Sequence, residues 1–240
     1  MNAAVLIPSY NPDENLLKVV EGLVQGHFDH IIIVNDGSKP ECALIFNQLE
    51  KIPQCHILTH PTNCGKGRAL KTGLNYYYTH FPDSDGIVTA DSDGQHLPAD
   101  IQRVSEELTK KTGQLILGVR KMGRHVPFKS LFGNVLTRFV FRLVTGKRIS
   151  DTQSGLRGLP RSLVPQLLKI PGERYEYEIN MLSWAAVNSI QIMEIPIDTI
   201  YIEGNKRSHF KPFSDSLRIY SHLFRTRRVH PFVEPKSRLR

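Results

Sequence analysis

Short apolar runs alternate with amphipathic segments through most of the chain, and this alternation limits the fold more than any other sequence feature. The run at 30–34 is uninterrupted and β-branched from Ile31, which is typical of a parallel strand buried on both faces. Strands are predicted at 5–7, 30–34, 56–59, 87–90, 114–119 and 192–195, and helices at 15–23, 41–49, 68–78, 99–109, 131–144, 161–168 and 174–186. This order predicts an α/β fold with a Rossmann-like, mostly parallel central sheet and helices on both faces.

The composition is that of an ordinary globular protein. The chain has 240 residues, of which 40% are apolar and 22% charged, so one large domain with a sizeable core is expected. No apolar run approaches the ~18 residues of a membrane-spanning helix, and the chain enters a strand at Ala3 without a basic leader. We therefore expect a cytoplasmic protein. The three cysteines show no C-x-x-C spacing, which argues against a disulfide framework or a zinc site.

Positive charge is concentrated in two blocks. Residues 120–161 contain ten Lys or Arg and one acidic residue, and residues 207–240 contain nine and two, whereas the rest of the chain sums to −8. Such blocks favour an anionic partner: phosphate groups, an acidic membrane surface or nucleic acid. A solvated basic face is the alternative interpretation.

Polar turns follow four of the predicted strands. These turns contain, in chain order, Pro8, Asp36, Gly65 to Gly67, and the pair Asp91 and Asp93. Because the carboxyl ends of parallel strands meet at one edge of a sheet, we expect these turns to converge on one crevice. Two carboxylates one residue apart suit a hard cation such as Mg²⁺ or Mn²⁺, which leaves positions open for a diphosphate. An Asp-rich turn that simply ends a strand is the alternative.

The predicted helix at 131–144 carries an apolar stripe. The opposite face is expected to show Lys129, Arg138 and Arg142. The stripe consists of two adjacent rows, Leu131, Val135, Phe139 and Leu143 beside Phe132, Leu136, Val140 and Val144. Two interpretations stay open, a buried domain helix and a helix that lies on a membrane surface.

Five motifs give the chain a family resemblance. In order, P-S-Y-N-P, V-N-D-G-S, N-C-G-K-G-R-A-L, D-S-D-G-Q-H and D-T-Q-S-G-L-R-G resemble the signatures of inverting GT-A nucleotide-sugar glycosyltransferases of the family 2 type. The chain is most similar to the branch that contains the dolichol-phosphate and polyprenol-phosphate sugar transferases. The resemblance implies a GT-A domain over 1–206, with a nucleotide-binding half at 1–119 and an acceptor half at 120–206, followed by a basic extension at 207–240. Where that branch has R-x-x-G-x-S-K, residues 205–210 read N-K-R-S-H-F.

The resemblance also implies roles for individual residues. It assigns nucleotide-sugar binding to Pro8, Tyr10, Asn11, Asp36, Gly65, Lys66 and Asp91. It assigns the metal, Mg²⁺ or Mn²⁺, to Asp91, Asp93 and Gln95. Arg120 and Lys129 fall where the polyprenol-phosphate branch places cations for the acceptor phosphate.

The nature of the acceptor decides which further residues the chemistry needs. A hydroxyl acceptor requires a general base, for which Asp151, Glu176 and Glu178 are the candidates. A phosphate acceptor is already anionic and requires cations more than a base. The basic block at 120–161 favours the phosphate acceptor, and a basic amphipathic helix beside the site would let the domain reach a lipid phosphate at a membrane surface.

The resulting hypothesis is a metal-dependent inverting glycosyltransferase. It moves a sugar from a UDP- or GDP-sugar to an acceptor such as a polyprenyl phosphate, with the protein cytoplasmic or peripheral at the inner face of the membrane. One alternative is a sugar-nucleotide nucleotidyltransferase, but the loop after the first strand is not of the Gly-rich, basic kind typical of that class. The other is a non-catalytic module that binds nucleotide sugars or nucleic acid. No nucleic-acid partner is expected, because the aromatic residues of the 120–161 block lie on the apolar stripe.

Overall fold

A computed structural model describes residues 3–111, 113–120 and 128–198, without the side chains of 128–133 and 136. The strands are β1 (Ala3–Ser9), β2 (Ile31–Asn35), β3 (Cys55–Thr59), β4 (Gly86–Thr89), β5 (Leu115–Arg120), β6 (Arg157–Pro160) and β7 (Ile192–Ile197). The α-helices are α1 (Glu14–Gln25), α2 (Ala43–Leu49), α3 (Lys66–His80), α4 (Pro98–Lys110), α5 (Phe128–Thr145), α6 (Val164–Leu167) and α7 (Glu176–Val187), with 3₁₀ turns at Pro40–Cys42 and Arg161–Leu163. The predicted elements are thus confirmed, with shifts of a few residues at their ends.

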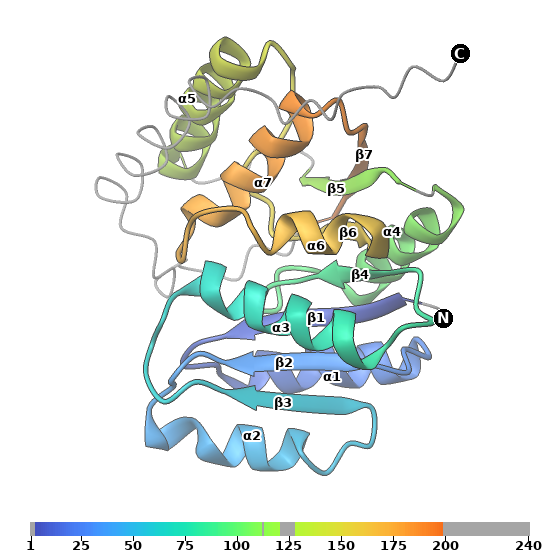
Figure 1. Ribbon diagram of the computed structural model, residues 1–240. Helices are drawn as coiled ribbons and strands as arrows, with labels where there is room; N and C mark the ends of the chain where they lie inside the picture. The colour runs from blue at the N-terminus through green and yellow to red at the C-terminus, as the bar shows by residue number, and fades with distance from the viewer. Residues whose placement is uncertain (1–2, 112, 121–127, 199–240) are drawn as a thin grey trace.

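The seven strands form one mixed sheet in the order β3-β2-β1-β4-β6-β5-β7 (Figure 1). β1 pairs in parallel with β2 on one side and with β4 on the other, so the strand order reverses at β1. The predicted α/β fold with a mostly parallel sheet is therefore confirmed.

β6 is the element that the sequence did not predict. It runs antiparallel to both β4 and β5 and so joins the two halves of the sheet. The strand has only four residues and contains Gly158 and Pro160, both of which are uncommon inside strands. Too few residues alternate for periodicity to reveal it.

Each face of the sheet has its own apolar core. Helices α1, α2 and α4 cover one face, where they pack on Val5, Ile7 and Ile33. Helices α3, α5, α6 and α7 cover the other face, where they pack on Ala4, Leu6 and other side chains that alternate with the first set (Figure 1). Burial on both faces explains why these strands read as continuous apolar runs.

Helix α5 packs differently from the prediction. Its buried side carries Phe141 together with two polar residues, Asn134 and Thr137. The predicted stripe is split: Val140 and Val144 pack against the core, whereas Val135 is 50% exposed and Phe139 and Leu143 are each 59% exposed. Arg138, expected on the solvent face, is partly buried and donates from Nε to the carbonyl of Ile149 at 3.1 Å. The inner side of the helix is therefore mixed apolar and polar, and its outer side combines exposed apolar residues with exposed Arg142.

Within the described part of the chain, none of the helices has the length and apolar character needed to cross a membrane. The basic extension at 207–240 lies outside the described residues.

Candidate active site

The carboxyl ends of β1, β2 and β4 meet beside the point where the strand order reverses. Open α/β sheets bind ligands in the crevice at such a point. Two backbone hydrogen bonds fix the turns there, from Asp36 N to Ser9 O at 2.8 Å and from Ala90 N to Leu6 O at 3.0 Å. The turns that carry Tyr10, Asp36 and Asp91 therefore open onto one edge, as predicted.

The turn after β1 is tied to the turn after β2. Asn11 has a positive φ of 50°, and its backbone N–H donates to Ser38 Oγ at 2.9 Å. Its side-chain oxygen accepts from Lys39 N at 2.9 Å. Asn tolerates this left-handed conformation better than most residues. Asn11 thus shapes the turn that presents Tyr10, whereas Pro8 is buried inside β1, opposite Val34.

The carboxylate of Asp36 organises the loop that leads into α3. Its oxygens accept from the backbone N–H groups of Cys64 at 2.9 Å and Gly65 at 2.8 Å. His60 Nδ1 lies 2.7 Å from Asp36 Oδ1, and His60 Nε2 lies 2.9 Å from Thr72 Oγ1. His60 was not among the predicted site residues, although it stands directly after β3 and so at the same edge of the sheet.

Asp36, His60 and Cys64 also form a group of metal-type ligands, with one ligand atom from each within 4.8 Å of the others. Both ring nitrogens of His60 are, however, already engaged by Asp36 and Thr72. A histidine needs a nitrogen lone pair to bind a metal. We therefore interpret the group as a hydrogen-bonded cluster that holds the loop.

Gly65 and Lys66 begin α3 at the centre of the site. Gly65 has a φ of 104°, and an added Cβ there would lie 2.4 Å from the carbonyl oxygen of Glu173. The position therefore requires glycine on both conformational and steric grounds. Lys66 Nζ lies 2.7 Å from Asp91 Oδ1 and 2.9 Å from Glu178 Oε2, so one ammonium group joins two predicted site residues from different parts of the chain.

The charges of Lys66 and Asp91 support each other. Burial alone would lower the pKa of Lys66, but the carboxylates of Asp91 and Glu178 outweigh it and raise that pKa above its ordinary value. Burial alone would raise the pKa of Asp91, but Lys66 and His96 hold it well below its ordinary value. His96 Nε2 lies 3.2 Å from Asp91 Oδ2, so His96 stands beside the carboxylates, as its place in the motif suggested. Asp91 is thus ionised at neutral pH.

The residues after β4 fit the metal that the resemblance implies. Asp93 is exposed, but partial desolvation by the surrounding chain and the neighbouring charge of Asp91 raise its pKa. Gln95 donates to Asp93 from its backbone N at 3.0 Å and from Nε2 at 2.8 Å. Two carboxylates that repel each other beside an amide form an oxygen-rich set of the kind that Mg²⁺ or Mn²⁺ prefers, and a divalent cation would relieve the repulsion.

Arg120, at the end of β5, forms an ion pair with Asp151. Arg120 donates to Asp151 from Nε at 2.6 Å and from Nη2 at 3.0 Å. Asn134 Nδ2 and the backbone N of Gln153 also donate to Asp151, at 3.1 and 2.9 Å. Burial would raise the pKa of Asp151, but Arg120 outweighs it, so the pKa lies below its ordinary value. Lys129 lies in the first turn of α5, and its side chain is outside the described set.

One oxygen of Glu176 is engaged by the neighbouring backbone. Its Oε1 accepts from the backbone N–H groups of Glu173 at 3.0 Å and Arg174 at 3.2 Å, in the loop before α7. This is the reach-back contact by which an acidic residue satisfies backbone donors at the start of a helix. Glu178, by contrast, faces the crevice through its ion pair with Lys66.

Arg157 is a central residue to which the sequence analysis gave no role. Its side chain is 1% exposed, and it donates to the carbonyl oxygens of Ser154 at 3.1 Å and Glu178 at 2.5 Å. Burial lowers its pKa, whereas the nearby Glu178, Asp91 and Asp151 act to raise it. Arg157 therefore ties the backbone of the 151–155 turn to the backbone of α7 at Glu178. Its motif was recognised, but nothing in the motif identified these partners.

The 151–155 turn packs directly on the end of β4. Thr89 Oγ1 donates to the carbonyl of Gly155 at 2.7 Å. An added Cβ on Gly155 would lie 2.6 Å from both carboxylate oxygens of Asp91. The D-T-Q-S-G motif thus contributes a close approach to Asp91 in addition to the buried Asp151.

Comparison with known proteins agrees with this geometry. The model of the Glycosyl transferase family 2 matches residues 4–168. The UDP-N-acetylglucosamine–dolichyl-phosphate N-acetylglucosaminyltransferase of Methanococcus voltae is 33% identical over 217 residues, which cover 83% of this chain and 86% of that protein. The polyprenol monophosphomannose synthase of Mycolicibacterium smegmatis is 26% identical over 204 residues, with 80% and 75% covered.

A solved structure shows the same fold. Glucosyl-3-phosphoglycerate synthase of Mycobacterium tuberculosis, determined with Mn²⁺, UDP and phosphoglyceric acid, superposes with a TM-score of 0.70 at 18% identity, over 95% of this chain and 79% of that one. The predicted GT-A fold is therefore confirmed. The order of strands, the convergence of Lys66, Asp91 and Glu178 and the extent of the family match lead to one conclusion: this chain is a glycosyltransferase that belongs to Glycosyl transferase family 2.

Proposed function

We propose that this glycosyltransferase moves a sugar, with inversion and with the help of Mg²⁺ or Mn²⁺, from a UDP- or GDP-sugar to a phosphate-bearing acceptor such as a polyprenyl phosphate. One observation carries the choice of acceptor: all three carboxylates predicted as general bases are committed to other partners. Asp151 is held by Arg120 and Glu178 by Lys66. Glu176 is held through Oε1 by the backbone before α7, while its buried Oε2 has no hydrogen-bond donor among the described residues.

A general base must accept a proton during the reaction, which requires accessible lone pairs and a pKa near the working pH. Asp151 is fully buried with four donors on its oxygens and a lowered pKa. Glu178 is 8% exposed and is paired with a cation whose own pKa is raised by that pairing. Neither suits proton abstraction from a hydroxyl group. A phosphate acceptor needs no such base, because it is already anionic at neutral pH.

Different residues would then bind the nucleoside, the divalent cation and the acceptor phosphate. Asp36 and the 9–11 turn would hold the nucleoside, while Asp91, Asp93 and Gln95 would hold the divalent cation. When bound, this cation stabilises the negative charge that builds on the leaving diphosphate. Lys66 keeps Asp91 ionised and in place. Arg120, which is 20% exposed and held by Asp151, is the described cation that we assign to the acceptor phosphate.

The transfer itself is a single displacement. An acceptor phosphate oxygen attacks the anomeric carbon from the side opposite the diphosphate. The bond between the anomeric carbon and the diphosphate oxygen breaks, and its electron pair leaves with the diphosphate. The new carbon–oxygen bond lies on the opposite face, so the configuration inverts. The fixed cations act by lying where charge develops, which is the usual source of stabilisation in such sites.

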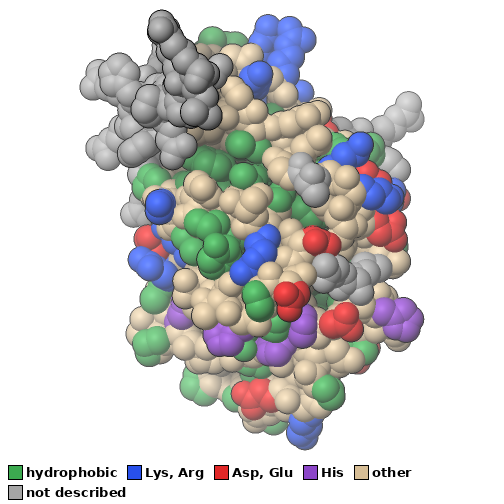
Figure 2. Space-filling model, turned by 45° about the vertical axis from the view of Figure 1, so that its right-hand side comes forward, with side chains coloured by type: hydrophobic (Ala, Val, Ile, Leu, Met, Phe, Trp, Pro, Cys, Tyr) green, Lys and Arg blue, Asp and Glu red, His purple; other side chains and the backbone are tan. Residues whose placement is uncertain are grey.

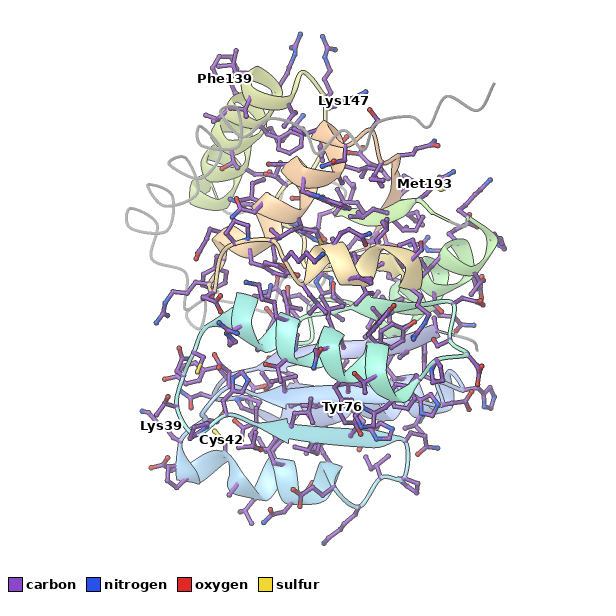
Figure 3. The ribbon with its side chains drawn as sticks, viewed as in Figure 1. Lys39, Cys42, Tyr76, Phe139, Lys147 and Met193 are labelled. Atoms are coloured by element: carbon purple, nitrogen blue, oxygen red, sulfur yellow. The ribbon has the colours of Figure 1, made fainter. Side chains whose placement is uncertain are left out.

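Helix α5 supports a contact with the membrane that would contain such an acceptor. Its residues include no Asp or Glu, and its exposed apolar side chains Val135, Phe139 and Leu143 lie next to exposed Arg142. Phe139, and Lys147 in the turn after α5, both lie at the outer end of the molecule (Figure 3). The opposite side of α5 reaches the site through Asn134. An apolar face flanked by cations suits the surface of an anionic bilayer.

The test compares a polyprenyl phosphate with the corresponding free polyprenol under the same conditions. With a radiolabelled UDP- or GDP-sugar and Mn²⁺, we expect transfer to the phosphate alone, loss of transfer with a chelator, and an inverted anomeric configuration by NMR. Transfer to the free polyprenol would contradict the choice of acceptor. Full activity of Asp93→Asn in the presence of a chelator would contradict the role of the metal.

A further inference from the structure

The carboxylate of Asp36 is close to saturated with hydrogen bonds. Oδ1 accepts from Cys64 N at 2.9 Å and lies 2.7 Å from His60 Nδ1, while Oδ2 accepts from Gly65 N at 2.8 Å. An ionised carboxylate offers about four lone-pair positions, two on each oxygen. Among the described contacts, three positions are taken, and the fourth is on Oδ2. The side chain is only 3% exposed, which further limits a ligand to a single contact.

His60 is the side chain that fills the second position on Oδ1. Because an ionised carboxylate has no proton to give, His60 Nδ1 must be the donor in this pair. The other ring nitrogen is anchored to Thr72 Oγ1 on α3 at 2.9 Å. The imidazole is thus held from both sides and is 13% exposed. It fixes both the orientation of Asp36 and the number of acceptors that Asp36 can offer.

The proposed function allows either uracil or guanine as the base of the donor, and the two bases present different hydrogen-bond donors to a carboxylate. Uracil presents one N–H, at N3, between two carbonyl oxygens. Guanine presents two adjacent donors, N1–H and the 2-amino group, which pair best with both oxygens of a carboxylate at once, in the manner of a bidentate pair. A carboxylate with one remaining position on Oδ2 matches the single donor of uracil.

We infer that His60 is a positioning residue that makes the base site select uracil over guanine by occupying Asp36 Oδ1. This inference rests on the proposed function, in which Asp36 contacts the base. It deepens that function, because it names the donor as a uridine diphosphate sugar and assigns the choice to a residue that does not touch the base itself.

The test is isothermal titration of the full chain with UDP and with GDP, each with Mn²⁺. For the wild type we expect UDP to bind at least about tenfold more tightly than GDP, which is the effect of about one charge-assisted hydrogen bond. His60→Leu keeps much of the side-chain volume but removes the donor. It should weaken UDP and bring the ratio of the two dissociation constants close to one. His60→Asn places an amide N–H near the position of Nδ1 and should preserve the ratio.

Thr72→Val removes only the anchor of His60 and should give an intermediate ratio. If His60→Leu does not fold, as judged by its melting temperature, the Asn and Val variants carry the test. The inference is overturned if the wild type binds GDP as tightly as UDP. It is also overturned if the variants weaken both nucleotides by the same factor, since that would be a purely structural effect. If the folded wild type binds neither nucleotide with Mn²⁺, the proposed function fails as well, and the two failures are distinguishable.

Discussion

Gly155 lies against the carboxylate of Asp91, so replacing it with alanine tests the proposed centre of the site. The added Cβ would lie 2.6 Å from both oxygens, whereas ordinary contact begins at 3.4 Å, so Asp91 must move by about 0.8 Å. Lys66 at 2.7 Å and His96 at 3.2 Å hold the same oxygens, so the movement cannot occur without disturbing both contacts. Misplacement by about 1 Å in an active site costs roughly 10²-fold in rate. We expect kcat/KM to fall about 100-fold, or ~2.7 kcal/mol of transition-state stabilisation.

The assay is initial-rate transfer to a polyprenyl phosphate, accompanied by a melting curve. Gly113→Ala is the matched control, because Gly113 has a φ of 78° and nothing within 4 Å of an added Cβ. That variant should lose about 1 kcal/mol of stability from its left-handed backbone and keep its kcat/KM. A folded Gly155→Ala protein with the kcat/KM of the wild type would refute the role given to Asp91 and to its close approach by Gly155.

Three further outcomes are expected. Lys66→Met should lower the free energy of unfolding, measured in urea, by about 3 kcal/mol, because it leaves Asp91 and Glu178 without their cation. The control Lys110→Met, which breaks an exposed pair with Glu107, should lower it by less than about 0.5 kcal/mol. Figure 2 shows histidines gathered on one face, and the pKa of His56 is lowered by burial and by His30 and His80. Because the unfolded chain then binds the proton more readily than the folded chain, the free energy of unfolding should fall as the pH drops below about 6.5. His56→Phe should flatten this pH dependence, and an unchanged profile would count against the assignment to His56. The double variant Phe139→Ser with Leu143→Ser should reduce sedimentation with vesicles of anionic phospholipid about tenfold. The control Leu44→Ser, at a 73% exposed site on α2, should not reduce it. Equal losses of sedimentation in both proteins would argue against α5 as the membrane-facing helix.

The sheet and the edge that carries the site were predictable from the sequence, because two simple rules determine them. Buried parallel strands read as apolar runs, as at Ile31–Asn35. Parallel strands also place their following turns at one edge, which brings Asp36, Lys66 and Asp91 to the same side of the molecule. Neither rule requires knowledge of distant contacts.

The partners of the polar residues could not be predicted in the same way. Asp151 is paired with Arg120, 31 residues away in the chain, and Arg157 with the carbonyl of Glu178, 21 residues away. Periodicity shows that a polar residue follows a strand. It does not show which donor forms hydrogen bonds with that residue's side chain. The faces of α5 were predicted only in part, for a related reason. The buried partners of Asn134 come from the 151–152 turn, so tertiary contacts outweighed the apolar stripe.

This pattern of partners also bears on the acceptor that we propose. Asp151 and Glu178 hold Arg120 and Lys66 in fixed positions instead of remaining ready to accept protons. A cation held in place costs little reorganisation when negative charge develops beside it. Such an arrangement leaves neither carboxylate free to act as the base that a neutral hydroxyl would need, whereas an acceptor that arrives as an anion needs no base. The engagement of these carboxylates therefore argues for a phosphate acceptor more directly than the basic composition of the 120–161 block does.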